Sequence, residues 1–458
     1  MLSETVNFIR KKLSSFNNTY IEDSEDVINK LFELCQYDDT NIEKEKEILE
    51  ILPNIYNINK IKEINDTNHN LLTCYISNNT SPSINVITEL IRLGIDLEYV
   101  SSGYRNADAI MYYMLKRNTI LKITKMLSHD DIANSYYSIY GYYKLHNLIT
   151  AYLANNRNPK MKVINYFENR CVSLTFICQN KYKLNHNALS ISLNNSTVPT
   201  AIIKKLASDE ILRNHTLWDI NGNYNILTYY FNKAHMIHLD VLEILLSCGC
   251  KSIYGNRLDD YKNNALLIYL HRADIVCKNV IDRLMESKYI GCIPPNTVIY
   301  TKERVYNILT WYVKHIDNLN IEIIDHLVSK GVNLHFIDNR SNNIAEISAQ
   351  TKNVSVELLM YFYKNNIKIS EYCLIYYLKS RPPDDYKECI VNYLFGHCKL
   401  YYHESWIHVD LDTICIDNMS YVTGSVKNIL NTYLPNIEAT KLINITTKNY
   451  FQLYCSIS

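Results

Sequence analysis

Residues 307–312 read Asn-Ile-Leu-Thr-Trp-Tyr, and the same short pattern returns along the chain. It consists of an asparagine, two apolar residues, a hydroxyl in most copies, and a tyrosine at the sixth place. Close copies stand at residues 70–75, 147–152, 225–230 and 264–269, the last without the hydroxyl. An asparagine directly before an apolar run is a favourable helix N-cap, because its side-chain oxygen accepts a backbone N–H of the first turn. Each copy therefore predicts the start of a helix.

Weaker copies of the pattern begin at Asn106, Asn187 and Asn343, which brings the number of anchor asparagines to eight. The first and last anchors, Asn70 and Asn343, are seven steps apart, so the mean period is (343 − 70)/7, or 39 residues. A fixed period of this size is the signature of a repeat architecture, in which each unit is one supersecondary element.

A second apolar segment follows each anchor after a break rich in Asn, Ser or Pro. The clearest second segments are residues 84–94, 240–249 and 320–331, whose apolar residues form a helical stripe. The glycines that close them, Gly94, Gly249 and Gly331, stand where a left-handed C-cap residue is favoured. Because two short helices cannot bury their apolar faces alone, neighbouring pairs must stack. The predicted fold is all-α, a solenoid of stacked antiparallel helix pairs.

The composition excludes several function classes. The chain has 458 residues, of which 47% are hydrophobic, and this is enough for a core. Its 47 basic residues match its 47 acidic residues, so no net positive charge favours nucleic acid. No apolar run is long enough for a membrane span, and the charged residues 10–12 do not fit a signal peptide. Thirteen cysteines without a paired framework favour a reducing compartment.

Enzyme motifs are absent from the sequence. No phosphate-binding glycine loop and no G-x-S-x-G turn occurs. His397, Cys398, His403 and His408 offer four zinc ligands, but their spacing is not that of a known zinc finger, and residues 400–402 between them indicate core packing. We therefore expect no zinc, no other cofactor and no enzymatic activity.

The unit resembles an ankyrin repeat. Residues 225–231, Asn-Ile-Leu-Thr-Tyr-Tyr-Phe, stand where that family has Thr-Pro-Leu-His and small or aromatic residues, and residues 331–334 stand where it has Gly-Ala-Asp-Val. The resemblance covers roughly residues 65–400, and the turn element survives best at residues 219–223. The period exceeds the ~33 residues of ordinary units, and we assign the excess to the breaks between the two helices. The abundance of Ile, Asn, Lys and Tyr is similar to that of the ankyrin proteins of poxviruses, a family of host-range and immune-evasion factors.

The repeat period and the need of a solenoid for a terminal cap predict three segments. Residues 1–64 form an N-terminal helical cap, residues 65–404 form eight or nine degenerate repeats, and residues 405–458 form a helical module. This last segment is similar to the abbreviated F-box-like module of many poxviral ankyrin proteins; the alternative is a terminal helix that caps the last repeat. Its predicted partner-binding residues are Leu434, Pro435, Ile437, Leu442, Ile443 and Tyr450.

The resemblance also implies a function in protein binding. We expect a viral scaffold that holds a host antiviral or inflammatory regulator and recruits it to a cullin-type ubiquitin ligase; the alternative is direct sequestration of the host protein. The expected location is the host cell cytoplasm, with the nucleus as the alternative, and neither nucleic acid nor membrane is an expected partner. Ankyrin units expose inter-repeat fingers, and the predicted partner-binding residues on them are Tyr104, Arg105, Asn221, Asn223, Asp260, Tyr261, Lys262, Lys302, Glu303, Arg304, Asn339, Arg340 and Ser341.

Overall fold

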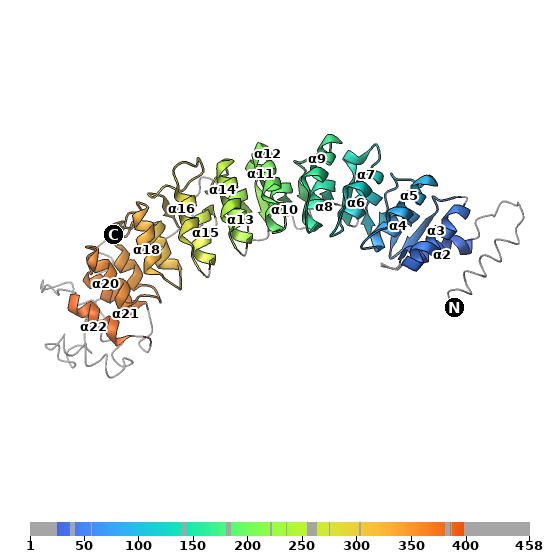
Figure 1. The fold of residues 1–458 in the computed structure, drawn as a ribbon. Helices are drawn as coiled ribbons and strands as arrows, with labels where there is room; N and C mark the ends of the chain where they lie inside the picture. Colours follow the sequence, from blue (N-terminus) through green and yellow to red (C-terminus); the bar gives the residue numbers. More distant parts are fainter. Residues whose placement is uncertain are drawn as a thin grey trace, which may run out of the picture. The chain divides into compact units, whose positions relative to one another are not determined.

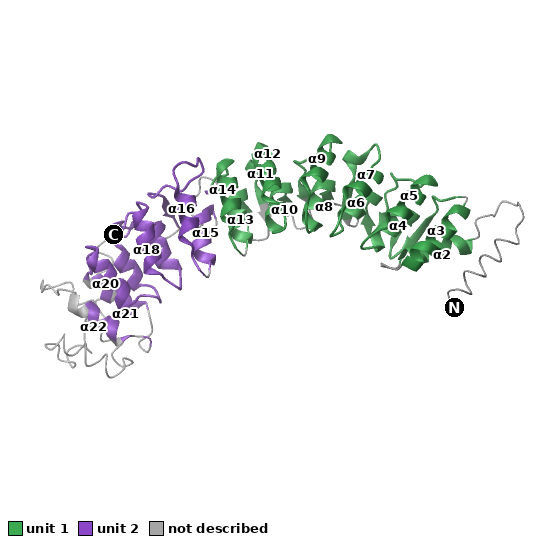
Figure 2. Cartoon of the chain, in the orientation of Figure 1, with its two compact units in different colours: residues 1–251 green, residues 252–458 purple. Residues whose placement is uncertain are grey.

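The chain divides into two compact units, residues 1–251 (unit 1) and residues 252–458 (unit 2), which Figure 2 distinguishes by colour. This division follows contacts, whereas the predicted segments follow the sequence period, so the boundaries at residues 64 and 404 stay predictions. The computed structural model describes residues 25–36, 42–55, 57–139, 143–179, 185–219, 222–234, 236–253, 263–273, 275–301, 304–380, 385 and 387–397. The segment 405–458, with its predicted module, lies outside these residues.

Unit 1 is mostly helical, and its helices follow one another in pairs (Figure 1). An N-terminal pair consists of α2 (Glu25–Gln36) and α3 (Ile42–Ile51), and the short η1 (Leu52–Asn54) ends it at Pro53. The first helices of the later pairs are α4 (Leu71–Asn78), α6 (Ala109–Met114), α8 (Leu148–Asn155), α10 (Ala188–Asn194) and α13 (Ile226–Lys233). Their second helices are α5 (Ile84–Arg92), α7 (Leu121–Met126), α9 (Met161–Asn169), α11 (Thr200–Ser208) and α14 (Leu239–Ser247). Two short elements, η2 (Ile132–Asn134) and α12 (Glu210–Asn214), lie between pairs.

Unit 2 continues the same pairing. Its first helices are α15 (Ala265–Arg272), α17 (Ile308–His315), α19 (Ile344–Ala349) and α21 (Glu371–Lys379). Its second helices are α16 (Lys278–Met285), α18 (Ile321–Ser329), α20 (Val356–Lys364) and α22 (Glu388–His397). Within each unit, every first helix contacts the first helix of the next pair, as α4 contacts α6 and α17 contacts α19.

The two kinds of helix differ in burial. Residues 71–76 of α4 are all buried, because neighbouring first helices and the partner helix enclose them. In α5, by contrast, only Val86, Ile87 and Leu90 are buried, and they form one stripe. Each such aliphatic side chain contributes about 1.5–3 kcal/mol when it is fully buried. The first helices are therefore the core of each row, and the second helices cover it.

The predicted glycine caps are confirmed. Gly94, Gly249 and Gly331 have φ angles of +80°, +86° and +89°, in the left-handed region. The backbone N–H of each glycine and of the residue after it bond back into the helix, for example Ile95 N to Leu90 O at 3.1 Å. Cys171 and Asn366 take the same conformation, with φ of +61° each, at the ends of α9 and α20. Five second helices thus end in the same way, and glycine provides only three of the ends.

The prediction of an all-α fold is wrong in one respect, because short β-strands precede several first helices. In unit 1 the strands are β1 (Ile61–Ile64), β2 (Thr67–Asn70), β3 (Ser102–Gly103), β4 (Arg105–Asn106), β5 (Tyr136–Ile139), β6 (Tyr143–Asn147), β7 (Cys178–Gln179), β8 (Asn185–His186), β9 (Leu217–Asp219) and β10 (Gly222–Tyr224). In unit 2 they are β11 (Val298–Tyr300) and β12 (Val305–Asn307). All the pairings are antiparallel, in the orders β1-β2-β3, β4-β5-β6, β10-β9-β8-β7 and β11-β12.

The hairpins also account for the extra length of the repeat. The breaks between the two helices of a pair are short, for example residues 79–83 and 316–320, whereas the connections to the next pair carry the strands. The sequence analysis placed the excess length in the breaks between the two helices of a pair. This prediction is wrong, because the excess lies in the connections that carry the strands. A sequence signal for the first hairpin exists: Asn65 and Asp66, with φ of +50° and +59°, form the two-residue turn that such residue types favour.

Candidate protein-interaction surface

The segments that precede the first helices are here called fingers, and the anchor residues hold them in place. The Asn70 Oδ1 accepts the backbone N–H of Thr73 at 2.8 Å, and its Nδ2 donates to Asp96 O at 2.9 Å. The amide thus ties the helix start to the segment after the second helix, 25 or 26 residues further along the chain. The same two bonds are made by Asn147, Asn187, Asn225, Asn307 and Asn343.

Two anchors depart from this arrangement. Helix α6 is capped by Asp108, whereas the sequence pattern predicted Asn106 as its anchor. That predicted anchor is therefore wrong by two residues. Asp108 has no amide to donate, and it accepts hydrogen bonds from the Ser135 hydroxyl and the His129 ring in place of donating one. Asn264 caps α15, but its Nδ2 is buried without a hydrogen-bond partner among the described residues.

The tyrosine at the sixth place of the pattern has a second structural role. The Tyr75 hydroxyl oxygen accepts the backbone N–H of Ser83, eight residues later, at 2.8 Å. It thereby satisfies one of the free N–H groups at the start of the second helix. Equivalent bonds are made by Tyr113, Tyr152, Tyr230, Tyr269 and Tyr312. The recurring asparagine and tyrosine are therefore the two polar groups that hold most of these helix pairs together.

The finger of residues 101–107 is held by several hydrogen bonds and by strand pairing on both sides. The buried Ser101 hydroxyl lies within hydrogen-bond distance of Arg105 O, Ala107 O and the Tyr112 hydroxyl, at 2.9–3.1 Å. Strand β3 pairs with β2, and β4 pairs with β5, so this finger joins its two neighbours. At Gly103, whose φ is +127°, a Cβ atom would stand 2.2 Å from Asp66 O. The two fingers can approach this closely only because Gly103 has no side chain.

Tyr104 and Arg105 extend from this fixed backbone into solvent. Tyr104 is 39% exposed, and its backbone N–H donates to Asp66 O at 2.9 Å. The Arg105 side chain is exposed, and its guanidinium makes no hydrogen bond or ion pair to any described residue. Burial and this guanidinium lower the pKa of His69 to about 4. Burial raises the pKa of Tyr137, while Arg105 acts in the opposite direction on it. Arg105 therefore lies close to both rings.

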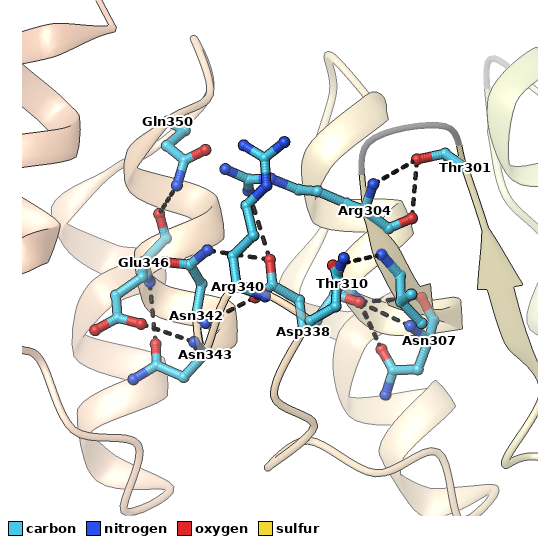
Figure 3. Close-up of polar contacts among 12 residues, drawn as sticks. Thr301, Arg304, Asn307, Thr310, Asp338, Arg340, Asn342, Asn343, Glu346 and Gln350 are labelled. Atoms are coloured by element: carbon cyan, nitrogen blue, oxygen red, sulfur yellow. Dashed lines mark hydrogen bonds and ion pairs between the residues drawn. The ribbon is translucent and has the colours of Figure 1, made fainter. Parts of the chain in front are cut away.

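The β11–β12 finger of unit 2 carries Arg304 in a different setting. Figure 3 shows the Arg304 side chain extending toward the turn of the next finger, residues 338–342. Its Nη1 lies 3.7 Å from the Asp338 Oδ2, with the two side chains 11% and 0% exposed. The Asp338 Oδ1 also accepts the backbone N–H of Arg340 and Asn342, at 2.8 and 2.7 Å. Arg304 is therefore built into the contact between two fingers.

The three predicted residues on that turn are exposed but differ in their backbone roles. The Asn339 Oδ1 accepts the backbone N–H of Val305 at 3.0 Å, which joins the turn to β12. Ser341 has φ of +64° and occupies the left-handed position of the turn. Arg340 is exposed and donates its backbone N–H to Asp338. Arg340 and Asn339 present their side chains at the surface of unit 2.

The other predicted residues fall into two groups. Asn223 lies in β10 and is exposed, opposite Trp218 of β9. Outside the described residues lie Asn221, Asp260, Tyr261, Lys262, Lys302, Glu303, Leu434, Pro435, Ile437, Leu442, Ile443 and Tyr450. The sequence interpretation missed Tyr137 and Asp338, because only the pairing of strands and fingers places them beside Arg105 and Arg304.

A Ser-His-Asp grouping in unit 1 does not have the geometry of a catalytic site. Ser135 and His129 both bond to the Asp108 Oδ2, and the His129 Nε2 lies 3.3 Å from the Ser135 Oγ. In a nucleophilic triad the histidine stands between the other two and takes the serine proton, whereas here the serine bonds directly to the carboxylate. All three side chains are buried. The bond to Asp108 raises the pKa of His129, as expected for a structural pair.

The described residues were compared with the requirements of a metal site and of a membrane span. Among those residues, no three His, Cys, Asp or Glu side chains are arranged to hold a metal ion. His397, Cys398, His403 and His408 are not covered by this finding, because their side chains lie outside the description. No helix of the described segments is long and apolar enough to cross a membrane.

No protein-family model matches the chain, and no curated protein matches it.

Proposed function

We propose that the chain is a protein-binding scaffold, a solenoid of degenerate ankyrin-type repeats. The observation that carries this proposal is the shared fixing of the helix pairs. In six of the described first helices an anchor amide donates to a carbonyl 25 or 26 residues later, and in six a tyrosine hydroxyl bonds to the start of the second helix. Repeated units of this kind stack into extended surfaces that bind other proteins. Specificity then depends on a few exposed side chains and not on the fold.

The finger surface is where we place the partner. Tyrosine and arginine dominate the energetics of protein interfaces, and Tyr104 and Arg105 are exposed on a rigid backbone. Fixing the backbone before binding lowers the entropy cost of association. Asn223, Asn339 and Arg340 are further exposed candidates on other fingers.

The resemblance to poxviral ankyrin proteins supports a more specific proposal. In it, the partner is a host antiviral or inflammatory regulator, and residues 405–458 recruit a cullin-type ubiquitin ligase through its adaptor subunit. The second candidate is sequestration of the host protein without a ligase. Neither candidate requires nucleic acid, membrane or a cofactor.

Affinity purification of the full chain from transfected cells, followed by mass spectrometry, tests the proposal. We expect a host protein that is retained by the wild type and lost when Tyr104→Ala and Arg105→Ala are combined. The matched control is Arg157→Ala, an exposed arginine in the break between α8 and α9. Equal capture by all three proteins would contradict the finger surface as the binding site.

A second comparison separates the two candidates. In the ligase reading, Leu434→Ala with Pro435→Ala removes the ligase adaptor from the purified complex and leaves the host protein bound. If no ligase subunit is present in the wild-type complex, the sequestration reading is favoured.

A further inference from the structure

The residues around Arg105 in unit 1 indicate the chemistry of the protein segment that this finger binds. Arg105 pairs with Ile139 across β4 and β5, so the side chain of Tyr137, two residues before Ile139, lies on the same face as Arg105. Tyr137 is half-buried, and Tyr112 is buried. Both rings feel the Arg105 charge, which acts against the rise that burial causes in the pKa of each tyrosine. The guanidinium therefore stands at the edge of a tyrosine layer.

The charge at this face is unbalanced. Arg92 and Arg283 have carboxylate partners in Glu89 and Glu286. Arg105 has none among the described residues, and its position beside Tyr112 and Tyr137 reduces the water around its inner side. An arginine in such a setting binds a carboxylate through two parallel N–H···O bonds, which gives both energy and orientation.

We propose that the Tyr104–Arg105 finger binds an acidic segment of another protein. A carboxylate side chain of that segment pairs with Arg105, and an adjacent apolar or aromatic side chain packs on the exposed Tyr104 ring. This inference rests on the proposed protein-binding function and names the chemistry of the partner at one finger. Nucleic acid fits less well, because binding to phosphates uses several cations, whereas residues 101–107 hold one, Arg105.

The test is a selection of random 12-residue peptides, displayed on phage, against the immobilised full chain. We expect the selected peptides to be enriched in Asp and Glu next to an apolar or aromatic residue. Their affinity, measured by fluorescence anisotropy, falls about tenfold or more with Arg105→Glu, since the charge pair becomes a repulsion. Tyr104→Ala weakens the same peptides by a smaller factor. Arg157→Glu makes the same change of charge in the break between α8 and α9, and it leaves the affinity unchanged.

Three results would overturn the inference. They are peptides without acidic enrichment, an equal loss with Arg105→Glu and Arg157→Glu, and displacement of the peptide by a 20-residue oligothymidylate at the same affinity. Circular dichroism of each variant shows whether the fold is retained, and Arg105→Gln provides a second variant without charge reversal.

The outcome also separates this inference from the proposed function. If a host protein is captured through the fingers and Arg105→Glu does not affect it, the scaffold function stands and the acidic partner is wrong. If acidic peptides bind through Arg105 but no host protein is captured, the inference stands and the scaffold function is wrong.

Discussion

Arg105 and Arg304 occupy the same place in two fingers, three residues before the residue that caps the following helix. Their surroundings are opposite. Arg304 is nearly buried against a fully buried carboxylate of the next finger, whereas Arg105 is exposed and without a carboxylate partner among the described residues. One repeat position thus serves to join two fingers in unit 2 and remains open to a partner in unit 1. The difference lies in the next finger, which provides Asp338 in one case and a tyrosine layer in the other.

The largest expected difference is in the stability lost when each arginine is replaced by alanine. Arg304→Ala leaves Asp338 buried without its counter-charge, and we expect a loss of about 3–4 kcal/mol of stability in unit 2. Arg105→Ala leaves no buried group unpaired, so its effect should stay within about 0.5 kcal/mol. Hydrogen exchange read by mass spectrometry in residues 298–307 and 338–350 measures the first effect locally. Equal protection in both variants would show that Arg304 is not a structural residue.

The next effect concerns how the finger of residues 101–107, here called the open finger, is held in place. Gly103→Ala places a Cβ against Asp66 O in a left-handed conformation, and we expect a loss of about 2–3 kcal/mol. The control is Gly94→Ala, where the φ is +80° but no atom lies within 4 Å of the new Cβ, so only about 1 kcal/mol is lost. Urea unfolding monitored by amide exchange in residues 61–70 and 101–107 compares them. If both cost the same, the close approach at Gly103 is not what fixes the finger.

These two cases show where sequence reasoning succeeds and where it stops. The Asn307 cap and the Gly331 cap depend on bonds within a few residues, so the local pattern predicts them. The pairing of Arg304 with Asp338 joins different fingers, and no local pattern contains it. The anchor at Asp108 was missed for a related reason, because Asp and Asn cap a helix equally well and only the distant Ser135 shows why aspartate is tolerated there.

The histidine beneath the open finger reports on the Arg105 charge. Burial first, and then Arg105, lower the pKa of His69 to about 4. Between pH about 6.5 and 4 the unfolded chain binds a proton at this residue and the folded chain does not, so stability falls as the pH is lowered, by about 3 kcal/mol. His129, whose pKa is raised by Asp108, acts in the opposite direction, so its contribution is full below pH 6.5 and is lost at higher pH.

We therefore expect Arg105→Gln to raise the pKa of His69 and Arg304→Gln to leave it unchanged. The titration of the His69 ring protons by NMR measures this directly. A pKa that stays at its wild-type value in Arg105→Gln would place the guanidinium away from the ring, and the contrast between the two fingers would lose its basis.

The smallest expected effect concerns the helix ends from which the fingers start. The finger of Arg105 follows Gly94 and the turn of Asp338 follows Gly331, while Cys171 takes the same left-handed conformation at the end of α9 with a side chain in place. A non-glycine residue in that conformation costs roughly 1 kcal/mol, part of which is offset because glycine has more freedom in the unfolded chain. Cys171→Gly should therefore stabilise unit 1 by about 0.5–1 kcal/mol.

Cys277→Gly is the matched control, since Cys277 is exposed and has φ of −90°, and we expect no gain in stability from it. The measurement is the urea midpoint of the two variants beside the wild type. A lower midpoint for Cys171→Gly would mean that the thiol makes a contact whose value exceeds the strain, and that the helix ends before the fingers are not equivalent.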